Sequence, residues 1–380
     1  TAGSDVIKTI GTLQSVGSGH GFILCFVARL SRLNFNIQGL TPFLLFDSGG
    51  IFLYNTGMLK IGELELGSNV LLAPLAGISD SSFRLLCREF GAGFTFVEMI
   101  NARAISHKNK KTKKMLELAP NDRPIGVQLL GFEVPYLLKA LDVLEHYDFD
   151  ILDFNAACPV KKVCRRGEGA SLMKEPELLK KILIALAGRL KKPLTIKIRS
   201  GWDQTSKNAV AIARLAQDAG VKAIFIHGRD RNQFYKGHVD YKIIADVKKN
   251  VSIPVIASGD VWGAKHALLM FEETGCDGIL VARGALGNPW IFKEIEEYLK
   301  NKRILEPPSI EEIVATMLKH LELSIAEHKE ENAIPLMRKF VGWYLKGRRF
   351  VRSIRQKVNS LNTKKDFYDL TEHVLALAKR

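Results

Sequence analysis

Short apolar runs alternate with longer amphipathic stretches along the chain from Asn69 to about residue 300. Apolar runs without polar alternation are typical of strands that are buried on both faces of a parallel sheet. Eight such strands are predicted, at residues 70–73, 94–98, 125–130, 151–154, 194–198, 223–226, 254–257 and 278–281.

Amphipathic helices are predicted between these strands, among them residues 79–90, 134–146, 175–190, 207–219 and 265–273. Ser79 or Asp80 can cap the first helix, and Pro289 after Asn288 suits the first turn of another. Strands that alternate with helices predict an α/β fold, either a closed (β/α)8 TIM barrel or an open, doubly wound sheet. Eight regular units within about 230 residues favour the closed barrel.

The alternation stops near Lys300, and only helical periodicity follows. Pro307 and Pro308 lie in a linker, after which Ser309 and Glu312 have the spacing of a capping box. We therefore predict a barrel domain at residues 58–303 and a smaller, all-helical C-terminal domain at residues 304–380. Residues 1–57 show no clear period, and we expect a disordered or non-native leader there, with a targeting segment as the alternative.

Basic residues exceed acidic ones, with 55 Lys and Arg against 40 Asp and Glu and a net charge of +15. Such an excess favours a polyanionic partner, and no apolar stretch reaches the roughly 18 residues of a membrane span. Nucleic acid is therefore the expected partner, without a membrane. The five cysteines are scattered and odd in number, which predicts free thiols in the cytoplasm and argues against a zinc site or any other metal site.

The basic excess is strongest from Arg338 to Arg380, where 12 Lys or Arg stand against 3 Asp or Glu. Arg348 and Arg352 are one helical turn apart, and Arg349 and Arg355 each lie about one turn from Arg352. Aromatic residues are interleaved with them, at Phe340, Trp343, Tyr344 and Phe350. We favour contact with RNA over a merely solvated helix face.

Unusual residues cluster where the predicted strands end, and the active site of a barrel lies at that end. The first strand leads into a small-residue turn, and amide, cationic and imidazole side chains follow other strands. Loops after the seventh and eighth strands often bind phosphate, which glycine amides and a guanidinium suit. The candidates for a phosphorylated, planar cofactor are Pro74, Leu75, Ala76, Gln128, Lys197, His227, Ser258, Gly259, Asp260, Ala282 and Arg283.

Cys158 follows the end of the fourth strand and precedes Pro159. Lys161, Lys162, Arg165 and Arg166 are close in sequence. Neighbouring cations ordinarily stabilise a thiolate, which suits a nucleophile better than an acid.

Together these motifs resemble the bacterial tRNA-dihydrouridine synthases, particularly their B-type subgroup. In order, the motifs are APLAG from Ala73, VQLLG from Val127, NAACPVKKV from Asn155, KIRSGW from Lys197, HGRDR from His227, SGD from Ser258 and ARGALGNPW from Ala282. The resemblance extends from about Met58 to Trp290 and more weakly over the helical tail.

The resemblance implies tightly bound FMN, NADPH as hydride donor and a tRNA uridine as substrate. Cys158 would protonate carbon 5 of the uracil after hydride transfer to carbon 6. Backbone at 74–76, with Gln128, Lys197 and His227, would hold the flavin ring, and residues 258–260 with Ala282 and Arg283 its phosphate region. Asn155, Lys162 and Arg199 would contact the target base or nearby RNA, and Arg348 and Arg352 would contact the tRNA from the helical tail. The protein is expected to be a monomer.

Four positions depart from the family's usual residues: Ala157, Asp230, Ser258 and Ala282. Asp230 would repel RNA phosphate unless it pairs with Arg229 or Arg231. Two alternatives stay open, a flavin barrel oxidoreductase acting on a small pyrimidine or enone, and a tRNA-binding protein whose redox site is vestigial.

Overall fold

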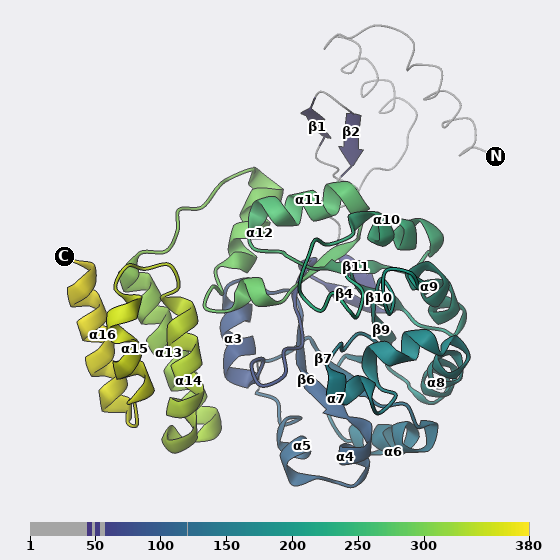
Figure 1. The fold of residues 1–380 in the computed structure, drawn as a ribbon, viewed down its shortest axis with the longest axis horizontal. Helices are drawn as coiled ribbons and strands as arrows, with labels where there is room; N and C mark the ends of the chain where they lie inside the picture. The colour runs from purple at the N-terminus through teal and green to yellow at the C-terminus, as the bar shows by residue number, and fades with distance from the viewer. Residues whose placement is uncertain (1–43, 48–49, 54–57, 120, 380) are drawn as a thin grey trace, which may run out of the picture.

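A closed barrel of eight parallel strands forms the centre of the computed structural model, which describes residues 44–47, 50–53, 58–119 and 121–379 (Figure 1). The strands are β5 (Val70–Leu72), β6 (Thr95–Asn101), β7 (Ile125–Leu130), β8 (Ile151–Asn155), β9 (Leu194–Arg199), β10 (Ala223–His227), β11 (Val255–Ser258) and β12 (Gly278–Val281). Consecutive strands pair from β6 to β12, and β12 pairs with β5. The Leu72 amide donates to the Phe94 carbonyl at 2.9 Å, and the Gly93 amide to the Val70 carbonyl at 3.0 Å. These two bonds close the sheet, so the barrel prediction is confirmed.

Helices surround the barrel and follow its strands in sequence. They are α3 (Ser81–Glu89), α4 (Ala102–Ser106), α5 (Lys110–Lys114), α6 (Val134–Leu144), α7 (Lys161–Cys164), α8 (Pro176–Arg189), α9 (Ala209–Asp218), α10 (Tyr241–Asn250), α11 (Ala264–Thr274) and α12 (Ile291–Asn301). Asp80 caps α3 by accepting from the Phe83 amide. Pro289 was expected in a first helical turn, and this prediction is wrong, because α12 begins only at Ile291 with Trp290 as its cap.

A hairpin that the sequence pattern did not reveal closes the bottom of the barrel. Its strands are β3 (Leu59–Ile61) and β4 (Leu64–Leu66), which pair antiparallel through Gly62 in a left-handed conformation. Leu59, Ile61 and Leu66 are buried among interior side chains of the barrel such as Phe225. The hairpin therefore completes the hydrophobic core below the site.

A second hairpin, β1 (Leu44–Asp47) with β2 (Gly50–Leu53), lies within the segment expected to be irregular. The sequence pattern did not reveal these two strands, and the rest of the expected leader lies outside the described residues, so the leader stays a prediction. Among the described helices, none has the length and hydrophobicity needed to cross a membrane.

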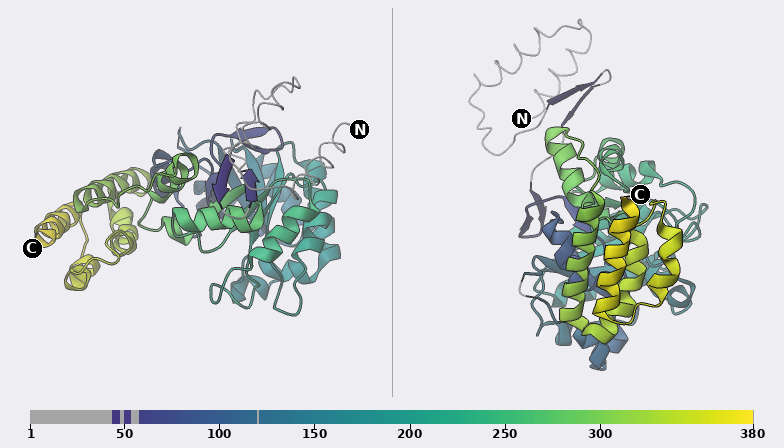
Figure 2. Two further views of the ribbon diagram at one scale, coloured as in Figure 1. Left: turned by 90° about the horizontal axis from the view of Figure 1, so that it is seen from above. Right: turned by 90° about the vertical axis from the view of Figure 1, so that its left-hand side faces the viewer.

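Four helices pack beside α3 at one side of the barrel (Figures 1 and 2). They are α13 (Ile310–His328), α14 (Glu330–Tyr344), α15 (Val351–Asn359) and α16 (Lys364–Ala378). Ser309 and Glu312 form the predicted capping box of α13. Phe83 of α3 lies 5.5 Å from Phe340 and 5.7 Å from His320, between ring centroids. The helical unit is thus joined to the barrel through apolar contacts.

Aromatic residues of the tail were predicted to contact RNA, and the structure places them elsewhere. Phe340 and Tyr344 are buried, while Trp343 and Phe350 are half-buried against the same core. Helical spacing alone does not say which face is buried, and here packing against the barrel decides it.

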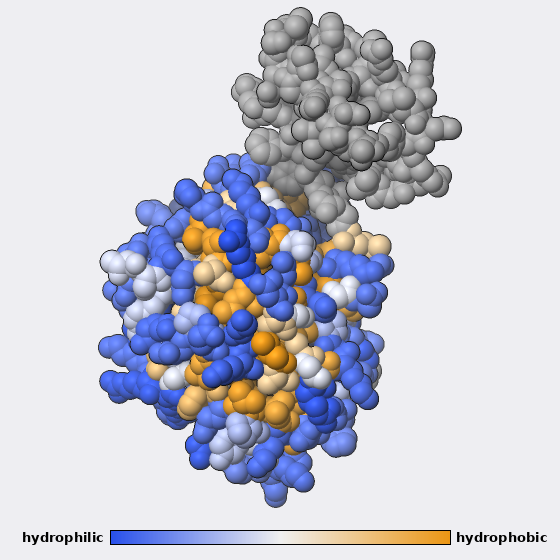
Figure 3. Space-filling model, turned by 90° about the vertical axis from the view of Figure 1, so that its right-hand side faces the viewer, coloured by the Kyte–Doolittle hydropathy of each residue, from blue (hydrophilic) through white to orange (hydrophobic). Residues whose placement is uncertain are grey.

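On the face of the barrel turned away from these helices, apolar side chains are exposed among hydrophilic ones (Figure 3).

Shortening a buried side chain of the β3–β4 hairpin should lower the stability of the barrel. We expect Ile61→Ala to lower the free energy of unfolding by about 2–4 kcal/mol, because a fully buried isoleucine is replaced by a cavity. Urea denaturation followed by circular dichroism measures this loss. Lys60→Ala on the exposed side of β3 is the control and should change stability by less than about 0.5 kcal/mol. Equal stability of the two variants would show that the hairpin adds nothing to the core.

Candidate functional site

A cavity of about 590 Å³ opens where the barrel strands end. All the predicted cofactor residues line it, from the turn 74–76 to Arg283, together with Asn155, Cys158 and Arg199. The additional lining residues are Ala73, Ile78, Met99, Ala157, Pro159, Val160, Val163, Tyr235, Val261, Trp262, Leu280, Gly284 and Leu286. Residues that are far apart in the sequence therefore meet at the predicted end of the barrel.

A chain of buried hydrogen bonds forms the floor beside Cys158. The Gln128 side-chain amide donates to Asp153 at 2.7 Å, and the Asn155 side-chain amide donates to Gln128 Oε1 at 2.8 Å. Asn155 Oδ1 accepts the backbone amides of Ala157 at 3.0 Å and Cys158 at 2.9 Å. Asn155 thus holds the turn that carries the thiol, and its side chain is already fully engaged within the protein.

The environment of Cys158 resolves the conflict between acid and nucleophile. Burial raises the pKa of the thiol above its ordinary value, and Arg199 and a hydrogen bond with the Val160 backbone oppose this only in part. The cations Lys161, Lys162, Arg165 and Arg166 are exposed and are not among the causes of the shift. Cys158 is therefore protonated at neutral pH, as an acid requires.

The opposite part of the cavity combines cationic and uncharged polar groups. Lys197 is half-buried, and burial lowers its pKa while Asp153 acts in the other direction. His227 is buried beside four cations, and burial and these cations hold its pKa well below the usual value. Its ring is therefore neutral. No hydrogen-bond partner of His227 Nε2 occurs among the described residues, so this nitrogen is available to a ligand.

Glycines that leave no room for a side chain follow the ends of β11 and β12. A Cβ on Gly259 would approach Val239 and His227 within 3.0 Å, and one on Gly284 would meet the Val261 carbonyl at 2.1 Å. Gly259 also has a φ of +126°, which side chains of L-residues rarely adopt. Ser258 is oriented by its bond to the Ile226 carbonyl at 3.1 Å, and Ala282 immediately precedes Arg283. Packing within the protein requires both glycines, and both also line the cavity.

Arg283 is held in place by an acid and two aromatic rings. Asp260 accepts from Arg283 at 3.0 Å and from Arg229 at 3.0 Å, so its carboxylate is committed to these cations. The Arg283 guanidinium lies 4.7 Å from the Tyr235 ring and 5.0 Å from the Trp262 ring, measured to the centroids. Asp260 thus orients a cation that faces the cavity.

Asp230 does not pair with Arg229 or Arg231, and this part of the sequence interpretation is wrong. The carboxylate is fully buried and accepts from Gln204 Nε2 at 2.6 Å and from the Gln233 amide at 2.8 Å. It organises its own loop and does not face solvent. The expected repulsion of RNA phosphate therefore does not arise.

Among the predicted substrate residues, Arg199 is buried like Asn155, whereas Lys162, Arg348 and Arg352 are exposed. Arg199 donates to the carbonyls of Ala157, Asp230 and Phe234 at 2.8, 2.9 and 3.0 Å, and burial lowers its pKa to about 10. It ties the Cys158 turn to the loop after β10. Lys162 is exposed on α7 near the cavity, whereas Arg348 and Arg352 are exposed in the helical domain.

Among the described residues, one group of side chains could hold a metal ion, formed by Asp80, Glu327 and His328. It lies outside the cavity. Their atoms are engaged with one another and with α3, since Asp80 accepts from Phe83, and Glu327 from the Ser82 amide at 2.8 Å. This group joins the two domains.

Sequence reasoning missed several parts of the site. Asp153 stands out as an acid inside an apolar strand, a signal that could have been used. Tyr235 and Trp262 carry no motif that distinguishes them from other surface aromatics. Their place beside Arg283 depends on how distant loops meet.

The protonation of Cys158 can be measured directly. We expect its alkylation by iodoacetamide, followed by peptide mass spectrometry across pH, to show a midpoint above about pH 9, because burial disfavours the thiolate. Lys161→Ala with Lys162→Ala should leave the midpoint unchanged, since these exposed cations do not set it. A midpoint below about 8.5, the ordinary value of a free cysteine, would contradict this interpretation.

Comparison with known proteins gives one consistent result. The family model described as "Dihydrouridine synthase (Dus)" matches residues 71–379. The protein named tRNA-dihydrouridine synthase B of Pseudomonas putida is 36% identical over 302 residues, which are 80% of this chain and 90% of the relative. Its namesake in Xanthomonas axonopodis pv. citri is 37% identical over 305 residues, 80% and 92% of the two chains.

Among solved structures, 6-hydroxypseudooxynicotine amine oxidase from Pseudomonas geniculata resembles this chain with a TM-score of 0.51. At 14% identity over 64% of this chain and 49% of that one, this likeness concerns the fold alone. The family match covers the barrel and the helical domain together, and the close relatives are matched over nearly their whole length. The chain belongs to the dihydrouridine synthase family.

Proposed function

We propose that this chain reduces uridine in tRNA to dihydrouridine, with FMN bound in the barrel cavity and NADPH as the hydride donor. The observation that carries the proposal is a protonated thiol, Cys158, on the rim of a cavity that is also lined by glycines and a fixed cation. Reduction of an enone-like double bond needs a hydride donor for one carbon and an acid for the other, and this arrangement has room for both.

The residues present suit FMN. Arg283 and the backbone around Gly259 and Gly284 would receive its phosphate, and the free Nε2 of His227 offers a hydrogen-bonding partner that the protein itself leaves unused. Lys197 and Gln128 would hold the polar edge of the flavin ring, with backbone at Pro74, Leu75 and Ala76 along the ring. Ser258 and Ala282 border the phosphate region, and Asp260 keeps Arg283 in position.

When bound, the reduced flavin supplies the hydride for carbon 6 of the uracil. Cys158 then donates its proton to carbon 5, and the thiolate left behind recovers a proton from solvent. Arg199 and Asn155 keep the thiol in place by holding the turn on both sides of it. The uracil must leave its stack in the RNA to reach the cavity, as bases generally do when an enzyme acts on them.

We further propose that residues 58–303 form the catalytic domain and residues 304–380 the domain that docks tRNA. Arg348 and Arg352 are exposed, and the sequence from Arg338 to Arg380 holds 12 Lys or Arg against 3 Asp or Glu, which suits contact with phosphates. Lys162 lies near the cavity and would meet the RNA backbone there. The site is complete within one chain, which suits a monomer, and the free thiols suit the cytoplasm.

Loss of the acid should abolish turnover and spare binding. We expect Cys158→Ala to bind FMN and tRNA as the unmodified protein does, yet to form dihydrouridine at least about a thousandfold more slowly, the upper part of the range for a general acid. Nucleoside mass spectrometry of tRNA incubated with NADPH measures the product. Undiminished product formation would refute the assigned role of Cys158.

Charge reversal on the helical domain should weaken tRNA binding across sequences. Arg348→Glu with Arg352→Glu should raise the dissociation constant for tRNA about tenfold or more and reduce its salt dependence, because phosphate contacts are lost. Filter binding at several salt concentrations measures both. Lys180→Glu with Lys181→Glu, on exposed residues of α8, makes the same change in net charge away from the proposed surface. If both double variants lose equal affinity, binding follows net charge and not a docking surface.

A further inference from the structure

The helical domain holds the first loop of the barrel at its middle and at its C-terminal end. This loop, residues 73–80, lines the cavity with Pro74, Leu75, Ala76 and Ile78. Its middle residue, Gly77, has a φ of +72°, so the loop turns sharply at a point where its backbone is exposed. The position of this loop sets the shape of one wall of the cavity.

Two charged side chains hold Gly77, and they come from different domains. The Gly77 amide donates to Glu98 Oε2 of β6, whereas Lys339 of α14 donates to the Gly77 carbonyl. Glu98 and Lys339 also attract each other, and both are withdrawn from solvent by the packing of the domains. The two peptide groups that flank the Gly77 α-carbon are therefore held from opposite sides, one by the barrel and one by the helical domain.

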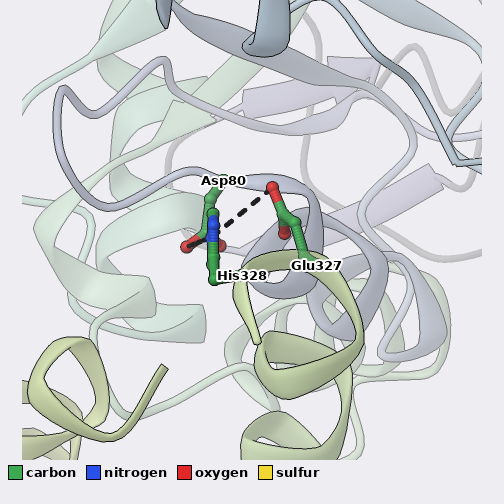
Figure 4. A group of neighbouring side chains, drawn as sticks. All are labelled: Asp80, Glu327 and His328. Carbon is green, nitrogen blue, oxygen red and sulfur yellow. Dashed lines mark hydrogen bonds and ion pairs between the residues drawn. The ribbon is translucent and has the colours of Figure 1, made fainter. Parts of the chain in front are cut away.

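The end of the loop is held by α13 at the group seen in Figure 4. His328 Nε2 lies 3.2 Å from Asp80 Oδ2, and Glu327 accepts the amides of Ser81 at 3.2 Å and Ser82 at 2.8 Å. Asp80 and Glu327 together satisfy the free amides at the start of α3. The loop thus cannot move without disturbing bonds to α13 and α14.

We propose that Lys339 is a positioning residue that couples docking of the helical domain to the shape of the cofactor cavity. No described residue of the helical domain lines the cavity, so the coupling passes through the first loop, which Lys339 holds at the Gly77 carbonyl and α13 holds at Asp80. Because coupling between two sites is reciprocal, FMN in the cavity stabilises the docked helical domain, and the docked domain strengthens FMN binding. This inference rests on the proposed binding of FMN.

The test measures the dissociation constant of FMN for the apoprotein by quenching of flavin fluorescence. Binding by the unmodified protein is measured first, because its absence would overturn the proposed function itself. Lys339→Met should then raise the dissociation constant roughly three- to tenfold, since a partly exposed, charge-assisted hydrogen bond is lost. Lys339→Arg should restore it to within about twofold, because a guanidinium can still donate to the Gly77 carbonyl.

Lys319→Met is the matched control. Lys319 of α13 pairs with Glu89 of α3 at 2.5 Å, so its loss removes an ion pair of the same interface without touching the loop. It should leave the FMN dissociation constant unchanged. Equal FMN affinity of Lys339→Met and the unmodified protein, or equal weakening by Lys319→Met, would overturn the proposal.

Hydrogen exchange on the unmodified protein gives a second test that needs no variant. Addition of FMN should slow exchange in residues 327–344 of the helical domain as well as in the loop at 74–80. Slowing in the loop alone, with residues 327–344 unaffected, would show that the two parts are not coupled.

Discussion

The hydrogen bonds of Asn155 link the buried strands of the barrel to the turn that carries Cys158. The side chain lies at the end of β8, takes its orientation from Gln128 and holds the amides of Ala157 and Cys158. Gln128 in turn donates to Asp153, which also accepts from Thr195 at 2.8 Å. Because buried polar groups are costly when unpaired, this network permits one arrangement of the turn. The position of the thiol follows from β7, β8 and β9 and not from the mobility of a loop.

The two ends of the barrel differ in which side chains they bury. Its lower end is filled by apolar side chains and plugged by the β3–β4 hairpin, so it contributes stability alone. Its upper end keeps charged and polar groups that are partly withdrawn from water: a neutral imidazole, a protonated thiol and a fixed guanidinium. Burial keeps the imidazole neutral and the thiol protonated, and the helical domain adds contacts on the first loop.

The strands and the ends from which the site is built could be predicted, because uninterrupted apolar runs mark a parallel sheet and its carboxyl ends converge. The lower hairpin could not, since its strands are three residues long and carry charges on the exposed side. The tail aromatics were misjudged because RNA binding and core packing share a helical period, and only tertiary docking separates them. The position of Asp230 and the contact of Lys339 with Gly77 likewise depend on loops that meet only after folding.

The protonation of Cys158 shows why position in space matters more than neighbours in sequence. Four cations within eight residues predicted a thiolate, yet all four side chains point into solvent, while the sulfur is withdrawn from it. We propose that this geometry serves the reduction of uridine in tRNA. Expression in a host without dihydrouridine synthases of its own, followed by nucleoside mass spectrometry of bulk tRNA, tests it most directly. We predict that dihydrouridine reappears in tRNA, whereas its absence in cells that contain folded, flavin-loaded protein would contradict the assignment.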